Sequence, residues 1–218
     1  LFREFLRATK LVNPKYIIGE NVKGLLKRKN KDGGFYIDII KSEFEALGYT
    51  IYTKVMKTCN YGIPQKRERL IIVGIKSDID NGYVFPEERP DTNNLYDIVK
   101  FSMEGALKIT PTDFDMTQVP DECILKNMEN DAVEHTEGPL KPHPNLISLA
   151  RVRDYVYNDK EYPLRLHFGK RIPVGGEVID IRKSINTIIC TYARQPRFFV
   201  PQQNKNGYYL RALLPNEL

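Results

Sequence analysis

A turn-forming basic segment that runs directly into a hydrophobic strand constrains the fold of this chain more than any other stretch. Residues 61–64 read Tyr-Gly-Ile-Pro, and an irregular backbone is expected there because Gly admits unusual dihedrals and Pro fixes its own. Residues 70–75 form an apolar, β-prone run that predicts a buried strand. Arg67 and Arg69 therefore lie at the mouth of a core strand, where guanidinium groups can grip phosphate or a planar polar ring. A solvated basic turn is the alternative.

The segments before this turn predict an α/β arrangement. Residues 1–12 have the spacing of an amphipathic helix, and residues 35–47 predict a second helix that Gly48 ends. The continuous apolar run at 15–19 is typical of a strand covered on both faces in a parallel sheet. Residues 49–56 and 70–75 predict a hairpin beside that strand.

Glu20 follows the apolar run at 15–19 immediately. Ligands of open α/β sheets bind at the carboxyl ends of strands, so Glu20 occupies a position where functional groups collect. A helix cap or a salt-bridge partner is the alternative interpretation for such a carboxylate.

Charge divides the chain into three blocks. Residues 1–76 carry a net charge of +9, residues 77–145 carry −10, and residues 146–218 carry +6. A polyanion is attracted to the two outer blocks and repelled by the middle one. The middle block is irregular, with one expected helix at 95–107. From Pro163 onward, short β-prone pieces at 164–168, 177–181, 187–191 and 197–200 alternate with basic residues, which suits a nucleic-acid-binding lobe or a plain small β-domain.

The cysteines and the hydropathy exclude several classes. Cys59, Cys123 and Cys190 are odd in number and have no paired spacing, so neither a disulfide framework nor a zinc site is expected, and a reducing compartment is favoured. No apolar run reaches the roughly 18 residues of a membrane span. The first residue is Leu1, so we expect a piece of a longer protein.

Several segments resemble the DNA cytosine-5 methyltransferases. Residues 14–25, which contain Glu20-Asn21-Val22, resemble the family's Pro-x-x-(apolar)-Glu-Asn-Val segment, and residues 60–69 are similar to its Gln-x-Arg-x-Arg segment. Residues 182–188 and 211–217 resemble the segment after the target-recognition region, with Leu214 in place of the usual Thr. The matches span essentially the whole chain.

The resemblance implies an incomplete α/β, Rossmann-like methyltransferase sheet in residues 1–76, a mostly β target-recognition lobe in 77–200, and a return segment in 201–218. It implies the catalytic residues Glu20, Arg67 and Arg69. A further set of polar and basic side chains is expected to contact substrate or DNA: Asn21, Gln65, Lys66, Arg165, Arg171, Arg182 and Arg194.

The chemistry of C5 methylation gives each catalytic residue a role. A nucleophile must add at C6 of cytosine, and protonation or strong hydrogen bonding at N3 makes that addition feasible. A carboxyl group desolvated at a covered strand end can donate near neutral pH, which suits Glu20. Arg69 can donate to cytosine O2, and Arg67 can hold a phosphate or brace the nucleophile loop. The base must be flipped out of the duplex, at a cost of a few kcal/mol.

Two motifs of the family are absent from these residues. There is no Phe-x-Gly-x-Gly loop for S-adenosylmethionine and no Pro-Cys nucleophile. The expected partners are therefore double-stranded DNA and the N-terminal half of the methyltransferase, in the same polypeptide or as a separate subunit, with S-adenosylmethionine bound mainly by that half. No metal is expected. The location implied is the cytoplasm of a prokaryote, or the nucleus in a eukaryote. The alternatives are a non-catalytic DNA-binding or regulatory subunit of the same fold and an RNA cytosine-5 methyltransferase.

Overall fold

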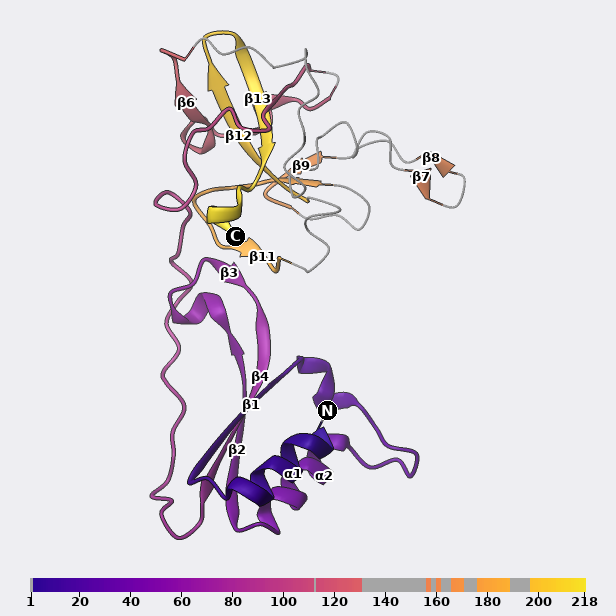
Figure 1. Cartoon of the computed structure of the whole chain (residues 1–218). Coiled ribbons are helices and arrows are strands. Elements are labelled where there is room, and N and C mark those ends of the chain that lie inside the picture. Colours follow the sequence, from indigo (N-terminus) through magenta and orange to yellow (C-terminus); the bar gives the residue numbers. More distant parts are fainter. Residues whose placement is uncertain are drawn as a thin grey trace. The chain divides into compact units, whose positions relative to one another are not determined.

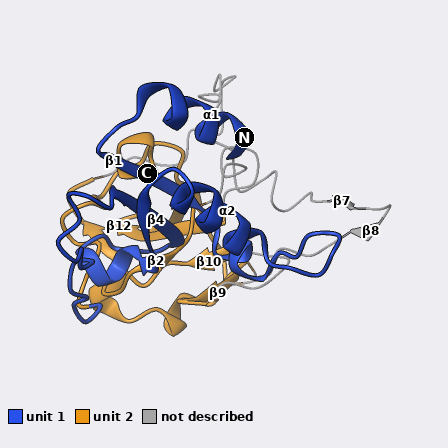
Figure 2. Cartoon of the chain, turned by 90° about the horizontal axis from the view of Figure 1, so that it is seen from below, with its two compact units in different colours: residues 1–91 blue, residues 92–218 orange. Residues whose placement is uncertain are grey.

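The computed structural model describes residues 2–111, 113–130, 156–157, 160–161, 166–170, 176–188 and 197–218. The chain divides into two compact units, unit 1 (residues 1–91) and unit 2 (residues 92–218), which Figure 2 colours separately. Within the described part, no helix has the length and apolar character needed to cross a membrane.

Unit 1 is a three-stranded antiparallel sheet with two helices. The strands β1 (Tyr16–Asn21), β4 (Glu68–Lys76) and β2 (Tyr49–Lys57) lie in the order β1-β4-β2 (Figure 1). The helices α1 (Phe2–Val12) and α2 (Tyr36–Glu45) share one apolar core with these strands. The predicted helices and the predicted hairpin beside the first strand are confirmed. Short elements complete the unit: η1 (Lys23–Lys27), η2 (Thr58–Tyr61) and β3 (Gln65–Lys66).

The expectation that the first strand is covered on both faces in a parallel sheet is wrong for this chain. β1 pairs antiparallel with β4, and its side chains alternate between the two faces of the sheet. Ile17 points into the core at 5% exposure, whereas Tyr16 and Ile18 are 59% and 72% exposed. The helices cover only one face of the strand, which explains the alternation.

The segment 77–91 belongs to unit 1, although the composition changes after Lys76. Its residues have no regular secondary structure and are fastened to β2 by side chains. Tyr52 donates a hydrogen bond to Asp80 at 2.6 Å, and its ring packs edge-on against Tyr83. Lys54 forms an ion pair with Glu88 at 3.1 Å.

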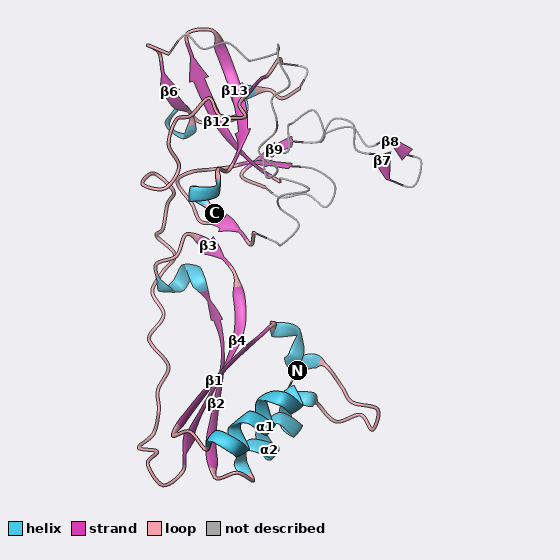
Figure 3. Cartoon of the chain, in the orientation of Figure 1, coloured by secondary structure: helices cyan, strands magenta, loops and turns pink. Residues whose placement is uncertain are grey.

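Unit 2 is mostly β (Figure 3). Its main sheet has the order β5 (Leu107–Lys108), β13 (Gly207–Ala212), β12 (Phe198–Asn204), β10 (Gly176–Val178) and β9 (Leu166–Phe168), and β6 (Leu125–Asn127) also pairs with β12. The remaining elements are β7 (Val156–Tyr157), β8 (Lys160–Glu161), β11 (Ile185–Asn186), η3 (Met116–Gln118), η4 (Asp121–Cys123) and η5 (Pro215–Glu217). Three predicted β pieces are thus confirmed as β9, β10 and β12, and 187–191 lies mostly outside the described residues.

The helix expected at 95–107 is not formed. Leu95 and Val99 are buried in the core of unit 2, and the backbone N–H of Leu95 donates to the carbonyl of Ile181. The N–H of Ser102 donates to the side chain of Gln202, and the segment ends in β5. A tertiary partner therefore takes the N–H of Ser102, which a helix would use, and the tertiary contacts override the local helical pattern.

The residues 201–218, expected as a return segment, form most of β12, then β13 and η5, and are tied together by a buried ion pair. Arg211 and Glu217 meet at 2.7 Å with side-chain exposures of 0% and 2%. The second guanidinium nitrogen of Arg211 also donates to the carbonyl of Lys100, and Glu217 accepts from the N–H of Leu214. Glu217 therefore makes one of the two contacts of a capping box, and the other, which a Thr hydroxyl at 214 would make to the N–H of Glu217, is not available to Leu.

Candidate active site

The antiparallel pairing of β1 and β4 brings Glu20 and Arg69 together. Glu20 lies opposite Ile71 in the ladder, and Asn21 lies opposite Leu70, so Arg69 follows the last paired position. Nε of Arg69 lies 2.7 Å from Oε1 of Glu20. Another guanidinium nitrogen of Arg69 donates to the carbonyl of Glu68 at 2.8 Å, which fixes the plane of the group.

The pair is only partly covered within this chain. The side chain of Glu20 is 53% exposed and that of Arg69 is 23% exposed. The desolvation expected for Glu20 is therefore not provided by these residues, because β1 is uncovered on one face. What remains is an acceptor and a donor side by side at a strand end, an arrangement that matches the edge of a planar heterocycle.

The turn 58–67 holds the backbone of Arg67 in place through Thr58. The N–H of Thr58 donates to the carbonyl of Arg67 at 2.9 Å, and the N–H of Arg67 donates to the Thr58 hydroxyl at 3.2 Å. The same hydroxyl donates to the carbonyl of Gln65. Gly62 has a φ of +86°, a left-handed conformation that favours glycine. The irregular backbone predicted here is confirmed.

The other predicted residues of this turn lie at its surface. Arg67 and Gln65 are half-buried, and Lys66 is exposed. Asn21 accepts a hydrogen bond from the N–H of Val22 at 2.8 Å, so its amide shapes the backbone after β1. Lys23 forms an ion pair with Glu68 at 3.0 Å, which ties η1 to the start of β4.

A second group of contacts fastens the turn to the segment 77–91. Asn60 donates to Glu88 at 2.7 Å, and this bond together with Lys54 lowers the pKa of Glu88. The N–H of Arg89 donates to the carbonyl of Asn60. Cys59 is 1% exposed, and burial is the main cause that raises the pKa of its thiol. This favours the interpretation of Cys59 as a small buried residue.

Arg182, expected to contact DNA, is held by carboxylates of unit 2. Its guanidinium donates to Asp180 at 2.8 and 3.0 Å and to Glu122 at 2.7 Å. The hydrogen bond from Arg182 is the main cause that holds the pKa of Asp180 well below its ordinary value. Burial raises the pKa of the neighbouring Cys123 to about 12. The other arginines expected at DNA, Arg165, Arg171 and Arg194, lie outside the described residues.

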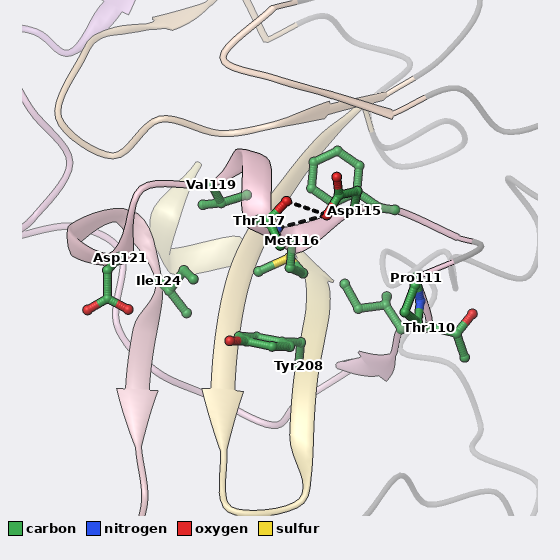
Figure 4. A pocket seen from close by; sticks show the side chains of 11 residues that line it. Thr110, Pro111, Asp115, Met116, Thr117, Val119, Asp121, Ile124 and Tyr208 are labelled. Atoms are coloured by element: carbon green, nitrogen blue, oxygen red, sulfur yellow. Dashed lines mark hydrogen bonds between the residues drawn. The ribbon is translucent and has the colours of Figure 1, made fainter.

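A cavity of about 280 Å³ in unit 2 contains none of the predicted site residues (Figure 4). Its walls are mostly apolar and include Phe114, Met116, Ile124 and Tyr208. The Asp115 carboxylate in its wall accepts hydrogen bonds from the backbone and side chain of Thr117. No cluster of His, Cys, Asp and Glu that could hold a metal is found in the described part of the chain.

Sequence reasoning missed three residues that position the site. Thr58 closes the turn, Glu68 holds Lys23, and Glu88 holds Asn60. Glu68 lies between Arg67 and Arg69 in the sequence, and an acidic residue among basic ones is a signal for an ion pair. Thr58 and Glu88 carry no such signal, because their partners are set by tertiary contacts.

The chain is similar to bacterial type II methyltransferases over part of their length. It is 44% identical to methyltransferase M.Eco47II of Escherichia coli over 103 residues, which is 46% of this chain and 24% of that protein. It is 33% identical to methyltransferase M.FnuDI of Fusobacterium nucleatum over 136 residues, which is 59% of this chain and 37% of that protein. The aligned parts thus span between about a quarter and just over a third of these relatives.

Solved structures show a weak likeness. A mutant of DNMT2 from Spodoptera frugiperda aligns with a TM-score of 0.41 and 14% identity, covering 59% of this chain and 39% of that one. The Dnmt2 methyltransferase of S. pombe aligns with a TM-score of 0.37 and 13% identity, covering 58% of this chain and 41% of that one.

The family is established by a family model rather than by these structural similarities. The model for the C-5 cytosine-specific DNA methylases matches residues 1–212 of the 218. Because the match covers nearly the whole chain, the chain belongs to the C-5 cytosine-specific DNA methylase family.

Proposed function

We propose that this chain is the part of a DNA cytosine-5 methyltransferase that holds the extruded cytosine and recognises the target. Glu20 protonates or hydrogen-bonds N3, Arg69 donates to O2, and Arg67 holds the adjacent phosphate or braces the nucleophile loop. S-adenosylmethionine supplies the methyl group. The observation that supports the proposal is the 2.7 Å contact between Glu20 and Arg69 at the ends of two neighbouring strands.

The ion pair has a consequence for the reaction. As the partner of Arg69 in an ion pair, Glu20 is a carboxylate and has no proton to give. A cytosine placed against both groups offers its O2 to Arg69, and the Glu20 carboxylate can then take up a proton from solvent and donate it toward N3. Negative charge that moves onto the ring during addition at C6 is stabilised by both donors.

The methyl donor and the attacking thiolate belong to another part of the enzyme in this proposal. The 218 residues contain neither a Phe-x-Gly-x-Gly loop nor a Pro-Cys pair. The exposed face of β1 offers the surface for that part, since Tyr16 and Ile18 are apolar and largely uncovered. β1 is also the outer strand of its sheet, with β4 as its paired neighbour in the described residues. The proposed setting is a bacterial restriction–modification system in the cytoplasm.

The alternative is a non-catalytic DNA-binding subunit of the same fold. A binding module has no need of a carboxylate at the base-holding position, because a carboxylate repels phosphate. The retained Glu20 therefore favours the enzyme. An RNA cytosine-5 methyltransferase is a third candidate. A competition between duplex DNA and RNA as methyl acceptors distinguishes the DNA enzyme from the RNA enzyme.

The experiment that tests the proposal is Glu20→Gln in the full protein, with labelled S-adenosylmethionine and duplex DNA. The amide keeps the size of the side chain but cannot deliver the proton, so turnover falls by roughly 100-fold or more while DNA affinity changes little. Glu43→Gln, an exposed change on α2, is the matched control and keeps its turnover. Full turnover of Glu20→Gln, or an equal loss of affinity and turnover, contradicts the catalytic role.

A further inference from the structure

A small hairpin between η1 and α2 carries a dense group of cations that the proposed chemistry does not use. Residues 27–36, here called the basic loop, leave the body of unit 1 beside the two helices (Figure 1). The N–H of Tyr36 donates to the carbonyl of Arg28 at 2.9 Å, and the N–H of Asn30 donates to the carbonyl of Gly34 at 2.8 Å. Gly33 closes the turn with a φ of +88°. The loop thus has a defined backbone.

The charge of the basic loop is compensated only in part, because Asp32 is its one carboxylate. Four of the five residues 27–31 are basic, and all four are exposed: Lys27, Arg28, Lys29 and Lys31. None of them forms an ion pair within the described residues. Four like charges this close repel one another, so a purely structural loop gains nothing from them.

Two aromatic rings hold part of this charge in place. The guanidinium carbon of Arg28 lies 5.5 Å from the ring centroid of Tyr36, and Nζ of Lys29 lies 5.4 Å from that of Phe35. Such contacts restrict the long side chains without neutralising them. Less side-chain entropy is then lost when the cations meet an anion.

The basic loop is fixed to the element that carries the candidate site. Leu25 and Leu26 pack against the core of unit 1 just before the loop, and Lys23 is paired with Glu68, the neighbour of Arg69. Arg28 follows Glu20 by eight positions, so at about 3.5 Å per residue their Cα atoms lie at most about 28 Å apart. This is less than one turn of duplex DNA, roughly 34 Å.

We propose that the basic loop binds the DNA backbone within one helical turn of the target cytosine, through the phosphates and without reading sequence. The inference rests on the proposed function for the position of the target base. Binding of phosphates by Lys27, Arg28, Lys29 and Lys31 releases counterions from the duplex, and the loop thereby offsets part of the cost of extruding the base.

The test measures the salt dependence of binding to a duplex of about two helical turns, roughly 20 base pairs, without S-adenosylmethionine. The full protein is compared with the triple variant Lys27→Gln/Lys29→Gln/Lys31→Gln. A charge-matched control, Arg3→Gln/Lys10→Gln/Lys15→Gln, removes three exposed cations elsewhere in unit 1. Circular dichroism confirms that both variants fold.

The slope of log K against log salt is negative, and for the loop variant we expect its magnitude to fall by about 0.9 for each phosphate contact removed. We also expect the affinity of this variant for DNA to fall roughly tenfold or more at low salt. A slope equal to that of the control variant overturns the proposal. A change of slope with duplex RNA but not with duplex DNA overturns it as well. Because this assay measures binding alone, its result is independent of the Glu20→Gln turnover experiment. A reduced slope supports the loop even where full turnover of Glu20→Gln rejects the catalytic proposal.

Discussion

At the scale of single residues, Arg69 is positioned by an ion pair and a hydrogen bond that use two nitrogens of its planar guanidinium group. Nε reaches Glu20, and another nitrogen of the same group reaches the carbonyl of Glu68. Lysine keeps the charge but offers a compact ammonium group. We expect Arg69→Lys to lower turnover by roughly 10- to 100-fold with unchanged thermal stability. Steady-state kinetics and a melting curve check this, with Lys10→Arg as a control, and normal turnover of the variant would remove Arg69 from the site.

Asp180 gives a second residue-scale prediction, on stability. Its carboxylate is 4% exposed and accepts from Arg182, which lowers its pKa. Such a carboxyl contributes stability above its unfolded pKa of about 3.9 and loses that contribution as the pH falls through the folded value. Asp180→Asn should therefore lower the free energy of unfolding of unit 2 by about 1–3 kcal/mol at pH 7.

Urea unfolding at pH 7 and pH 3 measures this difference. The difference in free energy of unfolding between the wild-type protein and Asp180→Asn is expected to shrink at pH 3, because the stabilisation by the native carboxylate begins to decrease below pH about 4. The exposed change Asp78→Asn serves as the control. If the difference in free energy of unfolding is the same at both pH values, the charge of Asp180 is not the cause of the lost stability.

At the scale of elements, the sheet of unit 1 depends on a glycine in its central strand. Gly74 of β4 lies between Ile17 of β1 and Ile51 of β2 in the ladder. A Cβ at position 74 would lie 2.6 Å from Ile17 and 2.8 Å from Ile51, closer than real contacts allow. Gly74→Ala should cost about 1–3 kcal/mol, which denaturant unfolding measures.

A control and a rescue accompany the Gly74 variant. Gly24→Ala meets its nearest neighbour only at 4.0 Å and is expected to leave stability nearly unchanged. Combining Gly74→Ala with Ile17→Val removes one of the crowding methyl groups and should restore part of the loss. If Gly74→Ala is as stable as the wild-type chain, the prediction is wrong, and small shifts of the strands relieve the contacts of the added Cβ with Ile17 and Ile51.

The elements of unit 1 were predictable because their signals are local, whereas those of unit 2 were less so. The helix at α1, the glycine that ends the α2 region and the β2–β4 hairpin each follow from short-range pattern. Residues 95–107 have helical spacing, yet the carbonyl of Ile181 and the side chain of Gln202, both distant in sequence, accept hydrogen bonds from two backbone N–H groups of this segment. A parallel pair such as β9–β10 joins strands whose partners no local motif specifies.

At the scale of the whole molecule, the sequence likewise predicts one property of the candidate site and not another. Glu20 and Arg69 were expected to meet, and the structure confirms their contact, since both follow from strand ends and a motif. The solvent exposure of the pair was not predicted. The apolar run at 15–19 suggested a strand covered on both faces, but Tyr16 and Ile18 are exposed within these 218 residues. The structure therefore brings Glu20 and Arg69 together, and in the proposed reaction the desolvation of Glu20 comes from the part of the enzyme that packs on that face.

The last prediction follows from this incomplete cover. The chain alone should transfer no methyl group, and mixing it with a half that carries Pro-Cys and Phe-x-Gly-x-Gly should produce transfer from labelled S-adenosylmethionine to duplex DNA. Ile18→Asp puts a charge on the exposed face of β1 and should weaken this complementation roughly tenfold or more, because the charge is desolvated on docking. Val84→Asp, at a similarly exposed apolar residue of the segment 77–91, is the matched control. Transfer by the chain alone, or equal complementation by the two variants, would show that β1 does not receive the missing half.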